Sequence, residues 1–237
     1  MCAHAMTPQR ILLLSNSIQY GFGYLDHAED EIREFLGEIR NVLFVPFAMH
    51  DRDGYAAKNR SRFATMGYHM ESIHTAKDAA AAVQSAEAIF IGGGNTFRLL
   101  KALYDHDVLR GICQRVHAGI PYLGSSAGSV VACPTLKTTN DMPIVQPPSF
   151  NALGIISFQI NPHYFDADPC STHMGETRRQ RLLEFVEENR KPVVGLREGA
   201  MLRFELGAVK LKGSASAVIF RSSGEPIEVM PGELLNI

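Results

Sequence analysis

The stretch AIFIGGGNTFRLLKALY occupies residues 88–104 and sets the pattern of the fold. Its first four residues form an apolar run typical of a buried strand, and three glycines follow at once. From Phe97 to Tyr104 the apolar residues recur at helical spacing. A strand that passes through glycines directly into a helix is the unit from which α/β folds are built.

The same alternation of strand and helix continues on both sides of this stretch. The patterns predict strands at 11–14, 42–45, 68–74, 88–91, 121–123, 158–162 and 193–196, and helices at 25–35, 56–66, 78–86, 97–104, 107–118 and 177–189. This rhythm implies right-handed crossovers, and therefore a doubly wound, mostly parallel sheet with helices on both faces. From Met201 onward, short alternating segments broken by glycines predict antiparallel C-terminal hairpins at an edge of the same sheet.

The composition is that of a soluble globular protein. Of the 237 residues, 46% are hydrophobic and 20% are charged, and the net charge is −2. This balance gives no indication of nucleic acid as a partner. No apolar run approaches the roughly 20 residues that cross a bilayer, so we expect no membrane partner. Because no linker divides the chain, we expect one domain over residues 1–237.

The cysteines and the first residues favour a cytoplasmic protein. The four cysteines form no Cys-x-x-Cys pair, and the start MCAHAMTPQR (1–10) lacks the apolar core of a signal peptide. No His, Cys and Asp residues have the spacing of metal ligands, so we expect neither a metal nor a cofactor. The sequence does not indicate an oligomeric state.

Residues 124–128, which read GSSAG, match the pattern G-x-S-x-G between a predicted strand and an apolar helix start. A sharp strand-to-helix turn exposes the hydroxyl of the central serine, and small neighbours relieve the crowding of the backbone. We therefore predict Ser126 as a nucleophile, with the N–H of Ala127 directed at a developing oxyanion. The alternative is a glycine-rich turn whose serines only cap the helix.

The glycines at 92–94, followed by Asn95, form a second candidate site. Consecutive glycines let a backbone approach a ligand and turn its N–H groups outward. An oxyanion donor, a phosphate cradle and a substrate clamp through Asn95 are all compatible roles, and a tight turn without a ligand is the simplest alternative. The loop lacks the sequence patterns of nucleotide-binding loops. Its pairing with Ser126 favours the oxyanion role.

A serine nucleophile needs a base, and the base needs an acid that orients it. His163 and Glu198 each follow a predicted strand, at the edge where open α/β sheets place their sites. The preferred triad is therefore Ser126, His163 and Glu198, from three successive strand ends. The α/β-hydrolase order, with the acid before the histidine, would need His173 as the base. Other candidates for the acid are Asp166, Asp168 and Glu176.

Several stretches, which keep their order and run through most of the chain, match one known family. They are LLLSNS (12–17), FIGGGNTFRLLK (90–101), GSSAG (124–128), TTNDMPIV (138–145), INPHY (160–164), HMGETRRQR (173–181) and GLREG (195–199). On these motifs the chain resembles peptidase E, the α-aspartyl dipeptidases, and looks most similar to the animal form. Ser125 stands where bacterial members tend to carry a bulkier residue, which bears on the pocket beside the nucleophile. Residues 200–237 carry little of the resemblance.

The resemblance implies a flavodoxin-like or class I glutamine-amidotransferase-like fold, and a serine peptidase that cleaves dipeptides beginning with aspartate. It implies the same catalytic triad as the one preferred above. It also implies that Gly94, or else Gly93, donates to the oxyanion together with Ala127. Arg178 is then the partner of the β-carboxylate of the substrate.

Recognition of a small dipeptide that begins with aspartate makes clear chemical demands. A guanidinium fork bonds both oxygens of a carboxylate, and Arg178 and Arg179 are close to the predicted base in the sequence. Without the resemblance, both arginines would be read as a solvated helix face. The substrate ammonium needs an acid, for which Glu176 or Asp141 could serve. Two alternatives stay open: a β-aspartyl, cyanophycinase-like peptidase on the same scaffold, and a non-catalytic protein that binds small molecules.

Overall fold

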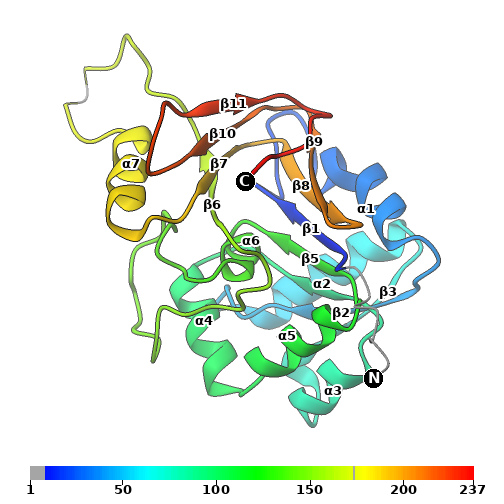
Figure 1. The fold of residues 1–237 in the computed structure, drawn as a ribbon. Coiled ribbons are helices and arrows are strands. Elements are labelled where there is room, and N and C mark those ends of the chain that lie inside the picture. The colour runs from blue at the N-terminus through cyan, green and yellow to red at the C-terminus, as the bar shows by residue number, and fades with distance from the viewer. Residues whose placement is uncertain (1–8, 173) are drawn as a thin grey trace, which may run out of the picture.

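The computed structural model describes residues 9–172 and 174–237 (Figure 1). Its centre is a seven-stranded sheet in the order β3-β2-β4-β5-β1-β8-β9. The parallel strands are β1 (Ile11–Leu14), β2 (Asn41–Val45), β3 (His69–Ser72), β4 (Ile89–Ile91) and β5 (Tyr122–Ser125). The hairpin of β8 (Ala200–Glu205) and β9 (Ala208–Gly213) adds antiparallel to β1. The predicted α/β fold with an antiparallel hairpin at the sheet edge is confirmed.

Helices cover both faces of this sheet (Figure 1), and alternate residues of β1 show why. Leu12 and Leu14 pack into one core with α1 and α2, whereas Ile11 and Leu13 pack into a second core with α3 to α6. All four side chains are completely buried, so replacing any of them by alanine should cost about 2–5 kcal/mol of stability. The helices are α1 (Glu29–Leu36), α2 (Arg52–Thr65), α3 (Ala79–Ser85), α4 (Thr96–Asp105), α5 (Leu109–His117) and α6 (Ala127–Ala132), with short 3-10 turns η1 (Asp26–Ala28) and η2 (Ile73–Thr75).

Capping side chains explain where two of the helices begin. The carboxylate of Asp78 caps α3 by accepting a hydrogen bond from the N–H of Ala81. Helix α2 begins at Arg52, earlier than the predicted residue 56, because Asp51 caps it by accepting from the N–H of Gly54. The apolar pattern alone therefore placed the start of α2 too late, because the capping aspartate lies before that pattern.

Four of the strands that follow α6 form a second sheet, and here the prediction of one sheet for all strands was wrong. This sheet has the order β11-β10-β7-β6, with β6 (Gln159–Tyr164), β7 (Val193–Arg197), β10 (Ala217–Phe220) and β11 (Ile227–Val229). Because β1 already has β5 on one side and β8 on the other, it offers no free edge to β7. Helix α7 (Arg178–Asn189) packs against the second sheet through Leu182 and Val186.

The long connection between α6 and β6 has no helix or strand, as the sequence predicted. It is nevertheless anchored, because Leu136, Leu153 and Ile155 belong to the main core. Thr135 and Asn151 also pair in an isolated bridge. Across residues 9–172 and 174–237, no helix is long and apolar enough to cross a membrane.

Candidate active site

Ser126 occupies the sharp turn between β5 and α6, as the sequence predicted. Its backbone has φ 51° and ψ −109°, a conformation that costs a residue with a side chain about 1–3 kcal/mol. The N–H of Ser126 donates to the carbonyl of Leu14, which holds the turn against β1. A Cβ at Gly128 would collide with the carbonyl of Ile91, so the second glycine of the motif is needed for close packing of α6 on β4. These two contacts therefore stabilise the strained backbone conformation of Ser126.

His163 lies within β6 and not beyond its end, where the sequence had placed it. It has φ 54°, and the pairing of β6 with β7 is irregular between Pro162 and Tyr164. The N–H of His163 donates to Ser15 Oγ at 2.9 Å. The irregular backbone turns the imidazole toward the other sheet, where its Nε2 lies 2.9 Å from Ser126 Oγ. This separation is within the range for proton transfer between a serine and its base.

Glu198 follows β7 and completes the arrangement. Its Oε1 lies 2.7 Å from His163 Nδ1, so the carboxylate fixes the ring and favours the tautomer with a proton on Nδ1. The side chains of His163 and Glu198 are 39% and 54% exposed. Solvent therefore screens their charges, and orientation of the ring is the larger part of what Glu198 provides.

The other acids considered from the sequence are engaged elsewhere. Asp166 pairs with Arg197 at 2.6 Å. Asp168 accepts a hydrogen bond from the N–H of Cys170, and Glu176 lies 3.5 Å from Arg181. The alternative base, His173, lies outside the described residues. Within the described part of the chain, Glu198 is the acid that the structure brings to the imidazole of His163.

The glycine loop comes close to the serine through Gly93, where a Cβ would lie 3.2 Å from Ser126 Cβ. The N–H groups of Gly92 and Asn95 donate to backbone carbonyls, and that of Gly93 faces the hydroxyl of Tyr55. Among the residues that the structure describes, the N–H of Gly94 has no acceptor. Gly94 has φ +133°, and a Cβ there would lie 2.7 Å from the carbonyl oxygen of Ala48, so only glycine fits.

Ala127 contributes the second available N–H group. It is the first residue of α6, so its N–H has no partner within the helix. The positive end of the helix dipole adds to its attraction for an anion. The N–H groups of Gly94, which lines a hollow with Ser126, and of Ala127, the next residue in the chain, are therefore the candidate donors to a developing oxyanion.

Arg178, at the start of α7, lines a hollow together with His163 and Glu198. It donates to the side-chain oxygen of Asn140, and its guanidinium lies 5.3 Å from the ring centroid of Phe165. Burial lowers its pKa, which shows that the charge is partly removed from solvent. In the described residues it has no carboxylate partner. The guanidinium is thus held in place with its charge uncompensated.

The neighbouring Arg179 differs in this respect. Its guanidinium pairs with Glu225 at 3.1 Å. Arg179 does not line the hollow that contains Arg178. It also does not line a second hollow, which Ser126, Gly94 and Asp141 line. The two arginines therefore form a natural pair for comparison.

Comparison with known proteins identifies the family. The family model described as peptidase family S51 matches residues 11–212. The chain belongs to peptidase family S51. It is 49% identical to peptidase E of Streptomyces coelicolor over 231 residues, covering 96% of this chain and 95% of that protein. It is 44% identical to a probable alpha-aspartyl dipeptidase of Drosophila melanogaster over 226 residues, covering 94% of each.

Solved structures show the same fold. A peptidase from an acI-B1 Actinobacterium has a TM-score of 0.72 at 17% identity and covers 97% of each chain. A putative peptidase E from Listeria monocytogenes has a TM-score of 0.66 at 20% identity, covering 88% of this chain and all of the other. The predicted resemblance to peptidase E is confirmed, and with it a serine-type peptidase function for this member of family S51.

Two of the predicted substrate-binding residues also hold the loop around residue 140 in this family S51 chain. Asn95 caps α4 by accepting from the N–H of Arg98, and its amide donates to the carbonyl of Met142. Asp141 Oδ2 accepts from the N–H and hydroxyl of Thr96 at 2.7 and 2.6 Å. Asp141 lines the hollow beside Ser126, whereas Asn95 does not. Both polar side-chain atoms of Asn95 are thus engaged, the oxygen at the start of α4 and the amide at the loop.

The sequence analysis did not identify the residues whose hydrogen bonds hold the family S51 site in place. Ser15 receives the N–H of His163, and Asn16 accepts from the N–H of Gly199 at 2.9 Å. Asn140 links Arg178 to β6, because its amide donates to the carbonyl of Pro162. Ser15 and Asn16 directly follow β1, and that position at a strand end was the signal that could have found them.

Proposed function

We propose that this chain hydrolyses dipeptides with an N-terminal aspartate through an acyl-enzyme on Ser126. The observation that carries the proposal is the continuous line of hydrogen bonds from Ser126 Oγ to His163 to Glu198, at 2.9 and 2.7 Å. The names of the relatives, peptidase E and probable alpha-aspartyl dipeptidase, support the substrate class. The whole chain acts as one domain in this proposal.

The reaction is an acyl transfer in two halves. Ser126 Oγ attacks the aspartyl carbonyl while His163 Nε2 takes the hydroxyl proton. The N–H groups of Gly94 and Ala127 stabilise the oxyanion, and their preorganisation is worth about 3–4 kcal/mol for each donor. The imidazolium then gives its proton to the leaving amine. In the second half, water attacks the aspartyl ester with His163 again as base, which restores the serine.

Recognition of the aspartate side chain is assigned to Arg178. Its charge has no partner in the described residues, and Asn140 and Phe165 fix its position. The β-carboxylate of the substrate would pair with the guanidinium of Arg178 through two hydrogen bonds. A neutral side chain would leave the partly buried guanidinium unpaired, and that penalty is the source of specificity.

The substrate ammonium is assigned to Asp141, which lines the hollow beside Ser126. Glu176 is the weaker candidate, because it pairs with Arg181 and lies outside that hollow. We further propose a cytoplasmic location, on the ground that Cys113, Cys133 and Cys170 are free thiols.

The test is leucine release from a panel of dipeptides. The panel contains α-Asp-Leu, β-Asp-Leu, Asn-Leu, Glu-Leu and Ala-Leu at equal concentration. We expect α-Asp-Leu to be cleaved with a kcat/KM about 10²–10⁴ above that of Asn-Leu. Cleavage of β-Asp-Leu alone would replace the proposal by the β-aspartyl reading. If no dipeptide is cleaved, the non-catalytic binding protein becomes the better description.

A further inference from the structure

A second hollow lies beside Ser126, and it shares His163 with the hollow that contains Arg178. Ser126, Gly94 and His163 form its floor, and the polar side chain of Lys58 stands on a wall made by α2. Ile18, Met49, Tyr24 and Tyr55 add apolar and aromatic side chains, and the polar lining residues include Asn16, Ser17, Asp51 and Asp141. His163 lines both hollows, so the reacting atoms stand between them.

Lys58 has no acidic partner among the described residues. Its Nζ lies 4.1 Å from the centroid of the Tyr24 ring, which holds the ammonium by a cation–π contact. Neither of the two carboxylates that line the same hollow forms an ion pair with Lys58. Asp51 caps α2 at Gly54, and Asp141 binds Thr96. The ammonium of Lys58 is therefore a cation without an ion-pair partner in the described part of the chain.

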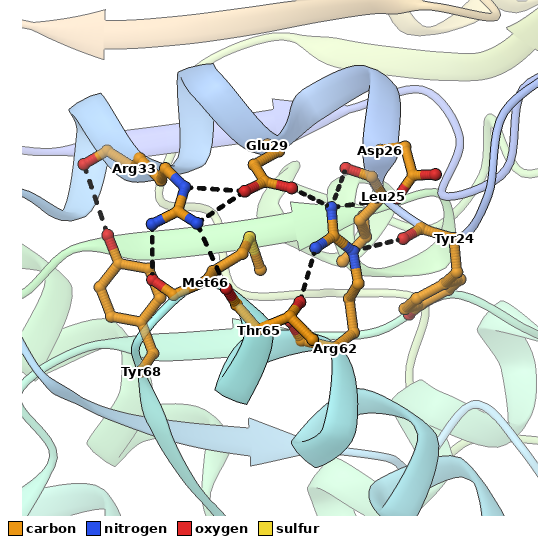
Figure 2. A network of polar contacts seen from close by, with 9 residues as sticks. All are labelled: Tyr24, Leu25, Asp26, Glu29, Arg33, Arg62, Thr65, Met66 and Tyr68. Atoms are coloured by element: carbon orange, nitrogen blue, oxygen red, sulfur yellow. Dashed lines mark hydrogen bonds and ion pairs between the residues drawn. The ribbon is translucent and has the colours of Figure 1, made fainter.

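The Tyr24 ring is itself held in place. Its hydroxyl donates to Asn59 Oδ1 at 2.9 Å, and Asn59 is completely buried on α2. Figure 2 shows the other support, in which Arg62 reaches the carbonyl of Tyr24 at 2.8 Å. Arg62 is clamped in turn by Glu29 at 2.6 Å and Asp26 at 3.1 Å. Contacts from η1, α1 and α2 therefore hold Tyr24, and the Tyr24 ring in turn positions the ammonium of Lys58.

Each hollow contains one cation that forms no ion pair among the described residues, and the two hollows meet at His163. Arg178 lines the first and Lys58 the second. The other arginine of the first hollow, Arg197, is neutralised by Asp166 and Glu228. A dipeptide that begins with aspartate carries two carboxylates, at its side chain and at its C-terminus. These carboxylates flank the peptide bond that is cleaved.

We infer that Lys58 binds the C-terminal carboxylate of the substrate and so restricts the enzyme to dipeptides. The inference rests on the proposed function and adds the residue that distinguishes a dipeptide from a longer peptide. In a longer peptide, the second residue carries an uncharged amide where a dipeptide carries its carboxylate. The apolar wall of Ile18 and Met49 would then face the second side chain. Lys58 touches the substrate at its end and takes no part in proton transfer.

The experiment compares Asp-Leu with Asp-Leu-amide in four proteins. These are the wild type, Lys58→Met, Lys58→Arg and Lys191→Met. Methionine keeps the unbranched stem against Tyr24 and removes the charge. Lys191 is an exposed lysine that lines neither hollow, so its variant controls for the loss of one positive charge. Turnover of the amide reports whether each variant keeps a working triad.

The wild type should cleave Asp-Leu about tenfold or more better than its amide. Lys58→Met should remove that difference by raising KM for Asp-Leu about tenfold, with kcat and amide turnover unchanged. Lys58→Arg should restore most of the preference, and Lys191→Met should behave as wild type. Equal losses on both substrates, or an unchanged preference in Lys58→Met, would overturn the inference alone. Absence of turnover of both substrates by the wild type would overturn the proposed function, and this inference with it.

Discussion

The backbone N–H of His163 donates to the hydroxyl of Ser15, a residue at the end of β1. That hydroxyl, which is completely buried, donates in turn to the carbonyl of Leu196 at 2.8 Å. Ser15 therefore joins the central sheet to the two strands that carry the base and the acid. Because His163 has a positive φ, its position depends on such outside support.

Ser15→Ala should lower both stability and turnover. The substitution removes the hydrogen bonds that Ser15 makes with the N–H of His163 and the carbonyl of Leu196, which should cost about 1–3 kcal/mol in the free energy of unfolding. The displaced imidazole should lower kcat about 10- to 100-fold with little change in KM. Denaturant unfolding and steady-state kinetics measure the two effects. Unchanged kcat in a folded Ser15→Ala protein would show that His163 is held by other contacts.

The arginine pair at the start of α7 offers a sharp test of specificity. Arg178→Lys keeps the charge and loses the fork, so the ratio of kcat/KM for Asp-Leu over Asn-Leu should fall about 10-fold or more. Arg179→Lys should leave the ratio unchanged, because Arg179 pairs with Glu225 away from both hollows. The reverse result would transfer the carboxylate site from Arg178 to Arg179.

Cys133 should be chemically inert in the native protein. It is completely buried at the end of α6, and burial raises its pKa to about 12. At pH 8 almost none of it is thiolate, the form that reacts. Treatment with iodoacetamide followed by peptide mapping should label the exposed Cys170, spare Cys133 and leave activity intact. Labelling of Cys133 with parallel loss of activity would favour a cysteine nucleophile as in the glutamine amidotransferases.

His27 should make the protein sensitive to acid. Neither ring nitrogen has a hydrogen-bond partner of normal geometry in the described residues. Burial lowers the pKa of His27 from 6.5, against the opposing pull of the Asn16 carbonyl and the carboxylates of Asp26 and Glu198. Below about pH 6.5 the unfolded chain therefore takes up a proton that the folded chain resists. This contribution makes stability fall as the pH decreases.

The matched variant for this effect is His27→Phe, which keeps an aromatic ring and removes the titration. Its free energy of unfolding should decline less steeply than that of the wild type between pH 7 and pH 5. Urea unfolding at several pH values measures both slopes. Parallel curves for the two proteins would contradict the assignment.

The positions of Ser126 and His163 could be predicted from the sequence because the signals for them are local. The turn at Ser126 is encoded by its own small neighbours, and His163 lies at the end of an apolar strand. The choice of Glu198 among four acids was harder. The correct choice depends on which acid follows β7, because β7 is the parallel neighbour of β6, which carries His163. In the sequence, the position of Glu198 after a predicted strand was the one local sign of this.

The second sheet could not be predicted in the same way. Whether β7 joins β1 depends on the hairpin of β8 and β9, which takes that edge later in the chain. Lys58 was missed for a similar reason. An exposed lysine on a helix is usually solvated, and only the fold brings Lys58 to the Tyr24 ring and into the hollow that Ser126 lines. These are contacts between distant segments, which no local pattern records.

The central claim, that Ser126 is the nucleophile, is tested most directly by two neighbouring serines. Ser125 is completely buried, and its hydroxyl has no hydrogen-bond partner in the described part of the chain. Leucine release from Asp-Leu should be measured for the wild type, Ser125→Ala and Ser126→Ala under one condition. We expect Ser125→Ala to stay within about twofold of the wild type, and Ser126→Ala to lose at least about 10³-fold in kcat. Turnover retained by Ser126→Ala would contradict the account.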